Sequence, residues 1–154
     1  MAITDTGGTT GPAKGVMLSR RAFRASLEQY TQVGTMYGRG GATLVLLPLF
    51  SAFGLCQCVH VPLCLGMTII LCPMFRPEQL GEMLRRYRPE QVSGTTSYWQ
   101  LLPQDPWADH ADLSFLPVPR CGRAALTAAM ERQLNDFLAQ SGCPHRLSKH
   151  TGMS

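Results

Sequence analysis

A run of ten residues near the amino terminus combines the residue types that hold a chain of phosphates. It reads T-G-G-T-T-G-P-A-K-G over residues 6–15. Glycine lets the backbone bend through positive φ and bring its N–H groups close to a ligand. Those N–H groups and the threonine hydroxyls form an anion-binding nest, to which Lys14 adds a compact positive charge. The run predicts a polyphosphate clamp, and composition alone leaves a flexible loop of small polar residues as the alternative.

This run is not a Walker A loop. That motif needs Gly-Lys-Ser/Thr, whereas Lys14 follows Ala13 and precedes Gly15. The phosphate-binding residues expected here are Thr6, Gly7, Gly8, Thr9, Thr10, Gly11 and Lys14.

The cysteines offer a second kind of chemistry, metal binding, which their spacing does not favour. No C-x-x-C pair occurs, and Cys56-x-Cys58-x-His60 lacks a second ligand pair at zinc spacing. Free cysteine in apolar sequence behaves as a small hydrophobic residue. We therefore expect no metal site and reduced thiols in a cytoplasm. Four thiols are expected to be buried and unpaired: Cys56, Cys58, Cys64 and Cys72.

Length and charge narrow the class of protein. A chain of 154 residues suits one domain with a normal core. The net charge is +4, but the basic residues are dispersed and show no aromatic-interleaved stripe, so no nucleic-acid partner is expected. Residues 40–75 carry no Asp, Glu, Lys or Arg, yet prolines and polar residues interrupt them. This stretch therefore predicts a buried strand-helix-strand unit, and no membrane span.

Hydrophobic patterning predicts alternating strands and helices, and hence an α/β fold with a partial parallel β-sheet flanked by helices. Continuous apolar runs stopped by proline indicate strands buried on both faces. The expected strands are 43–47, 68–72, 91–93 and, more weakly, 115–121, with the first three adjacent and parallel. The expected helices are 19–33 (capped by Ser19), 53–65, 77–87, 98–102 and 127–140 (capped by Thr127).

Ligands of such sheets bind at the carboxyl ends of the strands. Segments 48–54, 94–96 and 121–124 each follow or end an expected strand. The pattern therefore groups them at one edge of the sheet. For residues 94–96 an N-capping turn is an equally good interpretation.

The phosphate-binding run and residues 16–22 after it resemble the threonine/glycine-rich loop of the adenylate-forming (AMP-binding) superfamily. That superfamily includes acyl-CoA synthetases, peptide-synthetase adenylation domains and luciferases. The resemblance continues through 47–50, 94–99 and 121–124, nearly the whole chain. It implies a fragment of the large N-terminal domain of such an enzyme, one partial AMP-binding domain over 1–154. Its parts would be a phosphate loop at 4–16, a βαβ core at 43–103, and an adenine-site segment and truncated end at 115–154.

The resemblance also implies an activity and its cofactors. ATP and a carboxylic acid would form an acyl-adenylate, and coenzyme A would then capture the acyl group, with Mg²⁺ as the metal cofactor of the reaction. The acyl pocket would include Ser51, Phe53, Gly94, Thr95 and Thr96. The adenine site, in degraded form, would include Gly122, Arg123, Ala124, Thr151, Gly152, Met153 and Ser154.

Several residues depart from the family pattern. Ser51 stands where a histidine is usual, and Arg123 replaces a glycine and would crowd the adenine segment. Thr151 replaces the aromatic residue that stacks on adenine, and the sequence stops at Ser154, before the magnesium-binding glutamate. The ribose-binding aspartate, the hinge and the adenylation lysine are also absent from the sequence. The expectation is therefore an incomplete, inactive ligase with no complete set of catalytic residues, completed by missing sequence in trans or self-associating through exposed sheet edges. The alternative is a non-catalytic α/β nucleotide- or partner-binding module.

Overall fold

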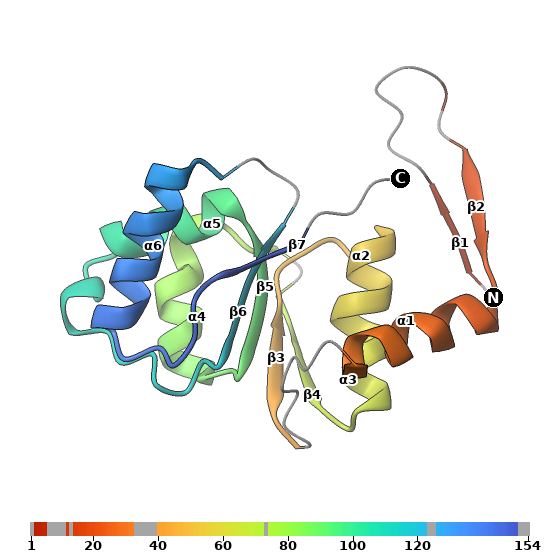
Figure 1. Cartoon of the computed structure of the whole chain (residues 1–154), viewed down its shortest axis with the longest axis horizontal. Helices are drawn as coiled ribbons and strands as arrows, with labels where there is room; N and C mark the ends of the chain where they lie inside the picture. The colour runs from red at the N-terminus through yellow and green to blue at the C-terminus, as the bar shows by residue number, and fades with distance from the viewer. Residues whose placement is uncertain are drawn as a thin grey trace.

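The computed structural model describes residues 2–5, 12, 14–32, 40–72, 74–122 and 126–150. The fold is organised around a five-stranded sheet (Figure 1). All neighbouring strands in this sheet are parallel, in the order β4-β3-β5-β6-β7. The predicted parallel pairing of the first three strands is confirmed. The strands are β3 (Ala42–Val45), β4 (Thr68–Leu71), β5 (Gln91–Thr95), β6 (Val118–Gly122) and β7 (Ser148–His150).

Helices cover both faces of the sheet. Figure 1 shows α4, α5 and α6 on one side, and α1, α2 and α3 on the other. Ser19 Oγ accepts from the Ala22 N–H and Thr127 Oγ1 from the Met130 N–H, so both predicted N-caps are confirmed. The elements are α1 (Arg20–Gln32), α2 (Ala52–Leu55), η1 (Cys56–His60), α3 (Val61–Cys64), η2 (Pro77–Gln79), α4 (Leu80–Tyr87), α5 (Thr96–Leu101), η3 (Leu102–Gln104), η4 (Ala108–His110) and α6 (Ala128–Gln140).

Some element boundaries differ from the prediction. The helix expected over 53–65 is α2, a π-helical turn η1, and α3 in succession. The helix expected at 98–102 begins already at Thr96, and the weak strand expected over 115–121 is β6 at 118–122. The sequence pattern for this strand is weak because it contains Pro117 and Pro119. Proline lacks the N–H that pairs neighbouring strands in a sheet. Residue 33, the expected end of the first helix, lies outside the described residues.

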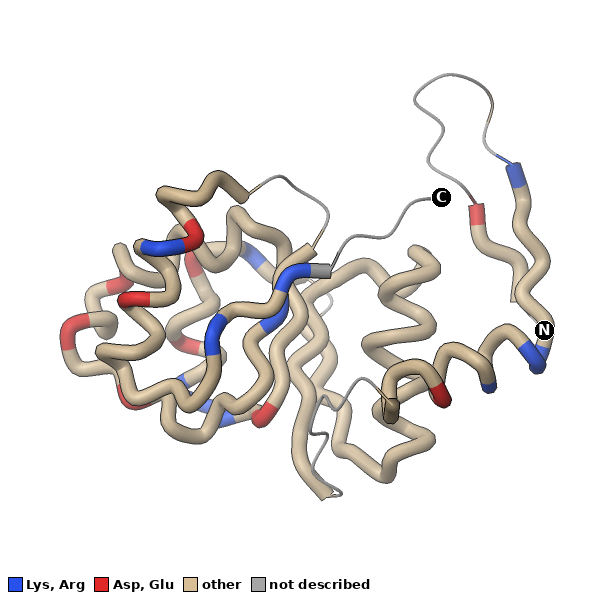
Figure 2. Tube along the Cα trace, viewed as in Figure 1, with Lys and Arg blue, Asp and Glu red and all other residues tan. Residues whose placement is uncertain are grey.

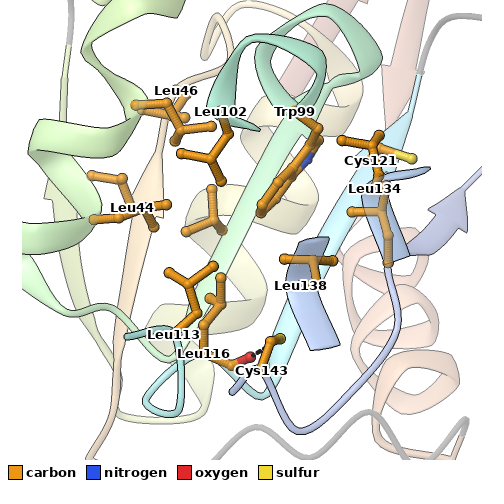
Figure 3. Packing of buried hydrophobic residues seen from close by; sticks show 14 residues of the cluster. Leu44, Leu46, Trp99, Leu102, Leu113, Leu116, Cys121, Leu134, Leu138 and Cys143 are labelled. Atoms are coloured by element: carbon orange, nitrogen blue, oxygen red, sulfur yellow. Dashed lines mark hydrogen bonds between the residues drawn. The ribbon is translucent and has the colours of Figure 1, made fainter. Parts of the chain in front are cut away.

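The two faces of the sheet have different chemistry. Alternate residues of a strand point to opposite faces. Leu44, Val92 and Cys121 join the main apolar core with side chains from α4, α5 and α6, and Figure 3 shows this packing. The face toward α1–α3 has a smaller apolar cluster, Val45 and Leu47 with Cys58 of η1, and also carries buried polar residues.

The expectation of four buried thiols is wrong for Cys64 and only partly right for two others. Cys58 is buried, Cys56 and Cys72 are half-buried, and Cys64 is exposed. Cys58 and Cys64 are six residues apart in one continuous helical segment, so they lie on different sides of it. All six cysteines are described as free thiols.

Acidic and basic residues are interspersed over α1 and from α4 to β7, whereas the stretch from β3 through α2, η1 and α3 to β4 carries neither (Figure 2). Within that part of the chain, no helix is both long enough and apolar enough to cross a membrane.

A surface cluster at the end of α4 gives a prediction about pH. Arg88 follows the last residue of α4 and has a left-handed backbone conformation (φ 41°). Its guanidinium carbon lies 4.3 Å from the Phe115 ring centroid, and its guanidinium donates to Asp112 Oδ2 at 2.9 Å. Hydrogen bonds from Ser114 and then from Arg88 lower the pKa of Asp112 to about 2. Because this folded-state pKa lies below the ordinary value of 3.8, the contribution to stability is present above pH 3.8 and is lost as the pH falls through about 2.

The measurement is an NMR titration of the Asp112 carboxyl carbon in the parent chain and in Arg88→Met. The variant should titrate closer to the ordinary value, while the Ser114 contacts keep part of the shift. A parent midpoint near 3.8 would contradict the described contacts.

Candidate functional site

The glycine/threonine-rich run that was predicted to bind phosphate is flanked by two strands that sequence patterning did not predict. β1 (Ala2–Asp5) and β2 (Gly15–Leu18) pair antiparallel, with Asp5 opposite Gly15. This register brings together the two ends of the segment that contains the run. Lys14 is exposed and lies directly before β2, whereas residues 6–11 lie outside the described residues. The signal for the hairpin was short runs with β-branched residues on both sides of a glycine-rich connection.

Beyond the carboxyl end of β3, a tight turn leads into α2. Ser51 is the N-cap of α2: its Oγ accepts from the Gly54 N–H at 3.0 Å and donates to the Pro48 carbonyl at 2.9 Å. Gly54 lies so close to Pro48 that a methyl group at its Cα would overlap the Pro48 carbonyl oxygen. Ser51 therefore holds the turn together, and sequence analysis missed this role. Phe53, half-buried, packs on the small apolar cluster of the α1–α3 face.

At the carboxyl end of β5, Gly94 is also closely packed. A Cβ there would lie 3.1 Å from Tyr98 Cδ2 and 3.4 Å from Trp99 Nε1. Thr95 occupies the N-cap position of α5, but its side chain makes no capping hydrogen bond, and its Oγ1 lies 2.8 Å from Ser97 Oγ. The Thr95 hydroxyl therefore pairs with a neighbouring hydroxyl at the strand end, and Thr96 is buried. The N-capping turn considered for residues 94–96 is therefore present in the backbone, but no side chain of Thr95 caps the helix.

Three strand ends lie in register at the same edge. Thr95 pairs with Gly122 across β5 and β6, and Gly122 pairs with His150 across β6 and β7. β7 was not predicted as a strand, since residues 148–150 have no apolar run. The predicted grouping of 48–54, 94–96 and 121–124 at the carboxyl edge is confirmed for the described residues, which end at Gly122 in the last segment. Arg123, Ala124, Thr151, Gly152, Met153 and Ser154 lie outside the described residues.

A buried polar cluster, defined by Tyr30, Cys58, Ser93 and Arg120, lies between α1, η1 and the sheet. Ser93 and Arg120 are partners in the β5–β6 register and are 3% and 1% exposed. The guanidinium carbon of Arg120 lies 5.1 Å from the Tyr30 ring centroid, a cation–π distance. Sequence reasoning missed this cluster, because its members are up to 90 residues apart and only the fold brings them together.

The electrostatics of the polar cluster follow from its burial. Burial raises the pKa of the Cys58 thiol to about 12, against the smaller opposing effects of the Ser93 hydrogen bond and the Arg120 charge. Burial likewise raises the pKa of Tyr30, which the Arg120 charge lowers in part. Burial therefore favours the neutral form of both groups at physiological pH, in which a thiol is a poor nucleophile.

The described residues contain no group of three or more His, Cys, Asp or Glu side chains that could hold a metal ion. These described residues thus supply no complete Mg²⁺ site of their own. For a nucleotide the fit is better, since the exposed Lys14 lies at the loop end of a hairpin that brackets glycines and threonines.

Comparison with known proteins is consistent across sequence and structure. The family model described as "AMP-binding enzyme" matches residues 1–153. A long-chain-fatty-acid–CoA ligase of Bacillus subtilis (strain 168) is 32% identical over 131 residues, 83% of this chain and 23% of that protein. A 4-coumarate–CoA ligase 2 of Oryza sativa subsp. japonica is 26% identical over 144 residues, 92% of this chain and 25% of that protein.

Solved structures show the same fold. A long-chain-fatty-acid-CoA ligase from Archaeoglobus fulgidus superimposes with a TM-score of 0.77 and 25% identity, over 98% of this chain and 31% of that one. ATP-bound MatB from Rhodopseudomonas palustris superimposes with a TM-score of 0.79 and 23% identity, over 98% of this chain and 28% of MatB. The chain spans about a quarter of the length of the curated relatives given above.

Proposed function

Because this chain belongs to the AMP-binding enzyme family, we propose that it forms the phosphate- and acyl-binding part of an ATP-dependent acid–thiol ligase of the acyl-CoA synthetase type. In that reaction a carboxylate attacks the α-phosphorus of ATP, the acyl-adenylate forms, and pyrophosphate leaves. The thiol of coenzyme A then attacks the acyl carbon and AMP leaves. The proposal rests chiefly on one observation, the alignment of the β5, β6 and β7 ends beside the β3–α2 turn.

Each proposed role follows from position and chemistry. Residues 6–11 and Lys14 would hold the phosphates. The same residues would neutralise charge on the departing pyrophosphate. Gly122 and the segments 123–124 and 151–154 would lie beside adenine, since Gly122 ends a strand at the carboxyl edge. The walls of the acyl pocket would come from Ser51, Phe53, Gly94, Thr95 and Thr96. No catalytic residue is assigned within this segment, whose contribution is positioning and charge stabilisation.

The acyl-pocket assignment has a physical consequence for Ser51. Its hydroxyl is engaged with both Pro48 and Gly54, so Ser51 shapes the turn. In the proposed pocket, Ser51 therefore contributes through the turn that it holds, next to the side chain of Phe53.

A second candidate function is phosphate binding without adenine recognition. It is favoured by two residues of the sequence: Arg123 has a bulky side chain in the adenine segment, and Thr151 has no ring to stack on the base. If it holds, ATP and inorganic triphosphate bind about equally. A marked preference for ATP instead supports a working adenine site.

We expect Lys14→Ala to weaken binding of ATP and of triphosphate to this chain. The variant loses a charge-assisted contact of about 1.5–3 kcal/mol, or roughly ten- to hundred-fold in affinity. The measurement is a calorimetric titration of both ligands, repeated at two salt concentrations because charge attraction weakens with salt.

The matched control is Arg85→Ala, which removes one positive charge from the exposed face of α4. Its affinity for both ligands should equal that of the parent. Equal losses in the two variants would show a nonspecific charge effect, and an unchanged affinity in Lys14→Ala would exclude the phosphate clamp.

A further inference from the structure

A groove of about 550 Å³ lies between α1 and the α2–η1–α3 segment, and Ala2 of β1 also lines it. The helical segment begins at the carboxyl edge of the sheet and runs for 13 residues, so the groove extends along it from Leu55 to Cys64, whose end of the segment lies roughly 18 Å from that edge. Phe23, Leu27 and Leu55 give the groove an apolar lining. Arg20 and Arg24, one turn apart on α1, give it positive charge.

A thiol and an imidazole face each other in this groove. Cys64 Sγ lies 3.8 Å from both ring nitrogens of His60, one helical turn away. The His60 ring is itself held by Phe23 of α1, edge to face, with ring centroids 4.9 Å apart. Packing between two helices therefore orients the His60 ring, and Cys64 beside it is exposed.

The other thiols differ from Cys64 in their surroundings. Burial raises the thiol pKa of the other five cysteines, and this favours the protonated, poorly nucleophilic form. These five are Cys56, Cys58, Cys72, Cys121 and Cys143. Cys64 combines exposure, an adjacent base and a groove that could hold an electrophile.

The groove also indicates which electrophile fits. An apolar lining favours an alkyl chain, because each buried methylene favours binding about fourfold. Arg20 and Arg24 favour an anionic group attached to that chain. Arg24 pairs with Glu28 at 3.2 Å, but both are exposed, and such a pair is weak enough to yield to a ligand. A long-chain acyl thioester of coenzyme A has both parts, an alkyl chain and phosphates.

We propose that Cys64 is an S-acylation site at which this chain accepts a long acyl group from an acyl-CoA thioester. His60 takes the thiol proton as Cys64 Sγ attacks the thioester carbonyl. The bond from the acyl carbon to the coenzyme A sulfur breaks, and His60 returns the proton to the leaving thiolate. The products are acyl-Cys64 and free coenzyme A, with no change in oxidation state. The inference does not depend on the proposed ligase function, because the thioester can be supplied ready-made.

The experiment incubates the purified chain with palmitoyl-CoA below its micelle-forming concentration and follows intact mass and peptide mass. We expect one palmitoyl group on Cys64, removable by neutral hydroxylamine as a thioester is. Acetyl-CoA, which has the same phosphates and no long chain, should react at least about tenfold more slowly.

Variants separate a built site from simple exposure. Cys64→Ser should abolish the adduct, and His60→Gln should slow it at least about tenfold, because a positioned base contributes a hundredfold or more when well aligned. Cys56→Ser, a half-buried thiol on the same helical segment, is the matched control and should react like the parent.

Three outcomes would overturn the proposal: no adduct, labelling of Cys56 or Cys72 as fast as Cys64, or a rate independent of both His60 and chain length. Circular dichroism of each variant shows whether the fold is retained. Loss of triphosphate binding in Lys14→Ala bears only on the ligase proposal, so the two proposals can fail separately.

Discussion

Trp99→Ala should destabilise this chain by about 3–5 kcal/mol, the range for replacing a buried tryptophan by alanine. Trp99 is 1% exposed and packs in the main apolar core, where Figure 3 shows it with side chains of β6 and α6. Its Nε1–H also donates to the Arg120 carbonyl at 2.8 Å, inside the protein. The variant thus loses packing and leaves a buried acceptor without that donor. Urea denaturation followed by circular dichroism measures the change.

Two further variants separate these contributions. Trp99→Phe keeps an aromatic ring but removes the N–H, and should cost about 1–3 kcal/mol. Trp107→Ala, at a half-buried tryptophan on the same side of the sheet, should cost less than Trp99→Ala. A loss below about 1 kcal/mol for Trp99→Ala would show that Trp99 is not a core residue.

Gly54→Val should destabilise the chain by about 3 kcal/mol or more and displace the turn at the end of β3. Replacing a helical glycine normally stabilises a helix slightly. Here even a methyl group at position 54 would overlap the Pro48 carbonyl oxygen, so the side chain must push the turn or the helix aside. The Ser51 hydroxyl, which bridges Pro48 and Gly54, would lose its geometry as well.

Ala52→Val is the matched control. Position 52 begins the same helix and is exposed. Valine there should therefore lower the stability only through its weaker helix propensity, by about 0.5 kcal/mol. Denaturation gives the stability difference, and amide NMR shifts of residues 48–51 report on the turn. Similar stability for the two variants would contradict the close packing of Gly54.

The sheet could be predicted largely because its central strands are continuous apolar runs with turn residues at their ends. Strands 43–47 and 68–72 were found this way, to within two residues of β3 and β4. β7 could not be found, because Ser148, Lys149 and His150 have no apolar pattern and are paired through their backbone with β6. A short strand at a sheet edge leaves little trace in side-chain hydrophobicity.

The candidate site was predictable in outline for a related reason. Glycine and threonine at strand ends are local signals, and the parallel topology brings them to one edge. The polar cluster was not predictable, since the burial of Arg120 depends on Tyr30 from a distant helix. Nor was the exposure of Cys64, because an apolar helix on one face of a sheet still has an outer side.

The order of strands in the sheet has a consequence for how the chain is made. After β3 and β4 have paired, β5 adds on the other side of β3, and β6 and β7 each add to the newest edge. No strand must be inserted between two that already pair. As the amino-terminal part leaves the ribosome first, the sheet can grow in the order of synthesis, each strand meeting an edge that is already formed. Pairing between parallel strands is slow because it joins distant residues. Sequential addition shortens that search, since at each step only one crossover remains to be closed.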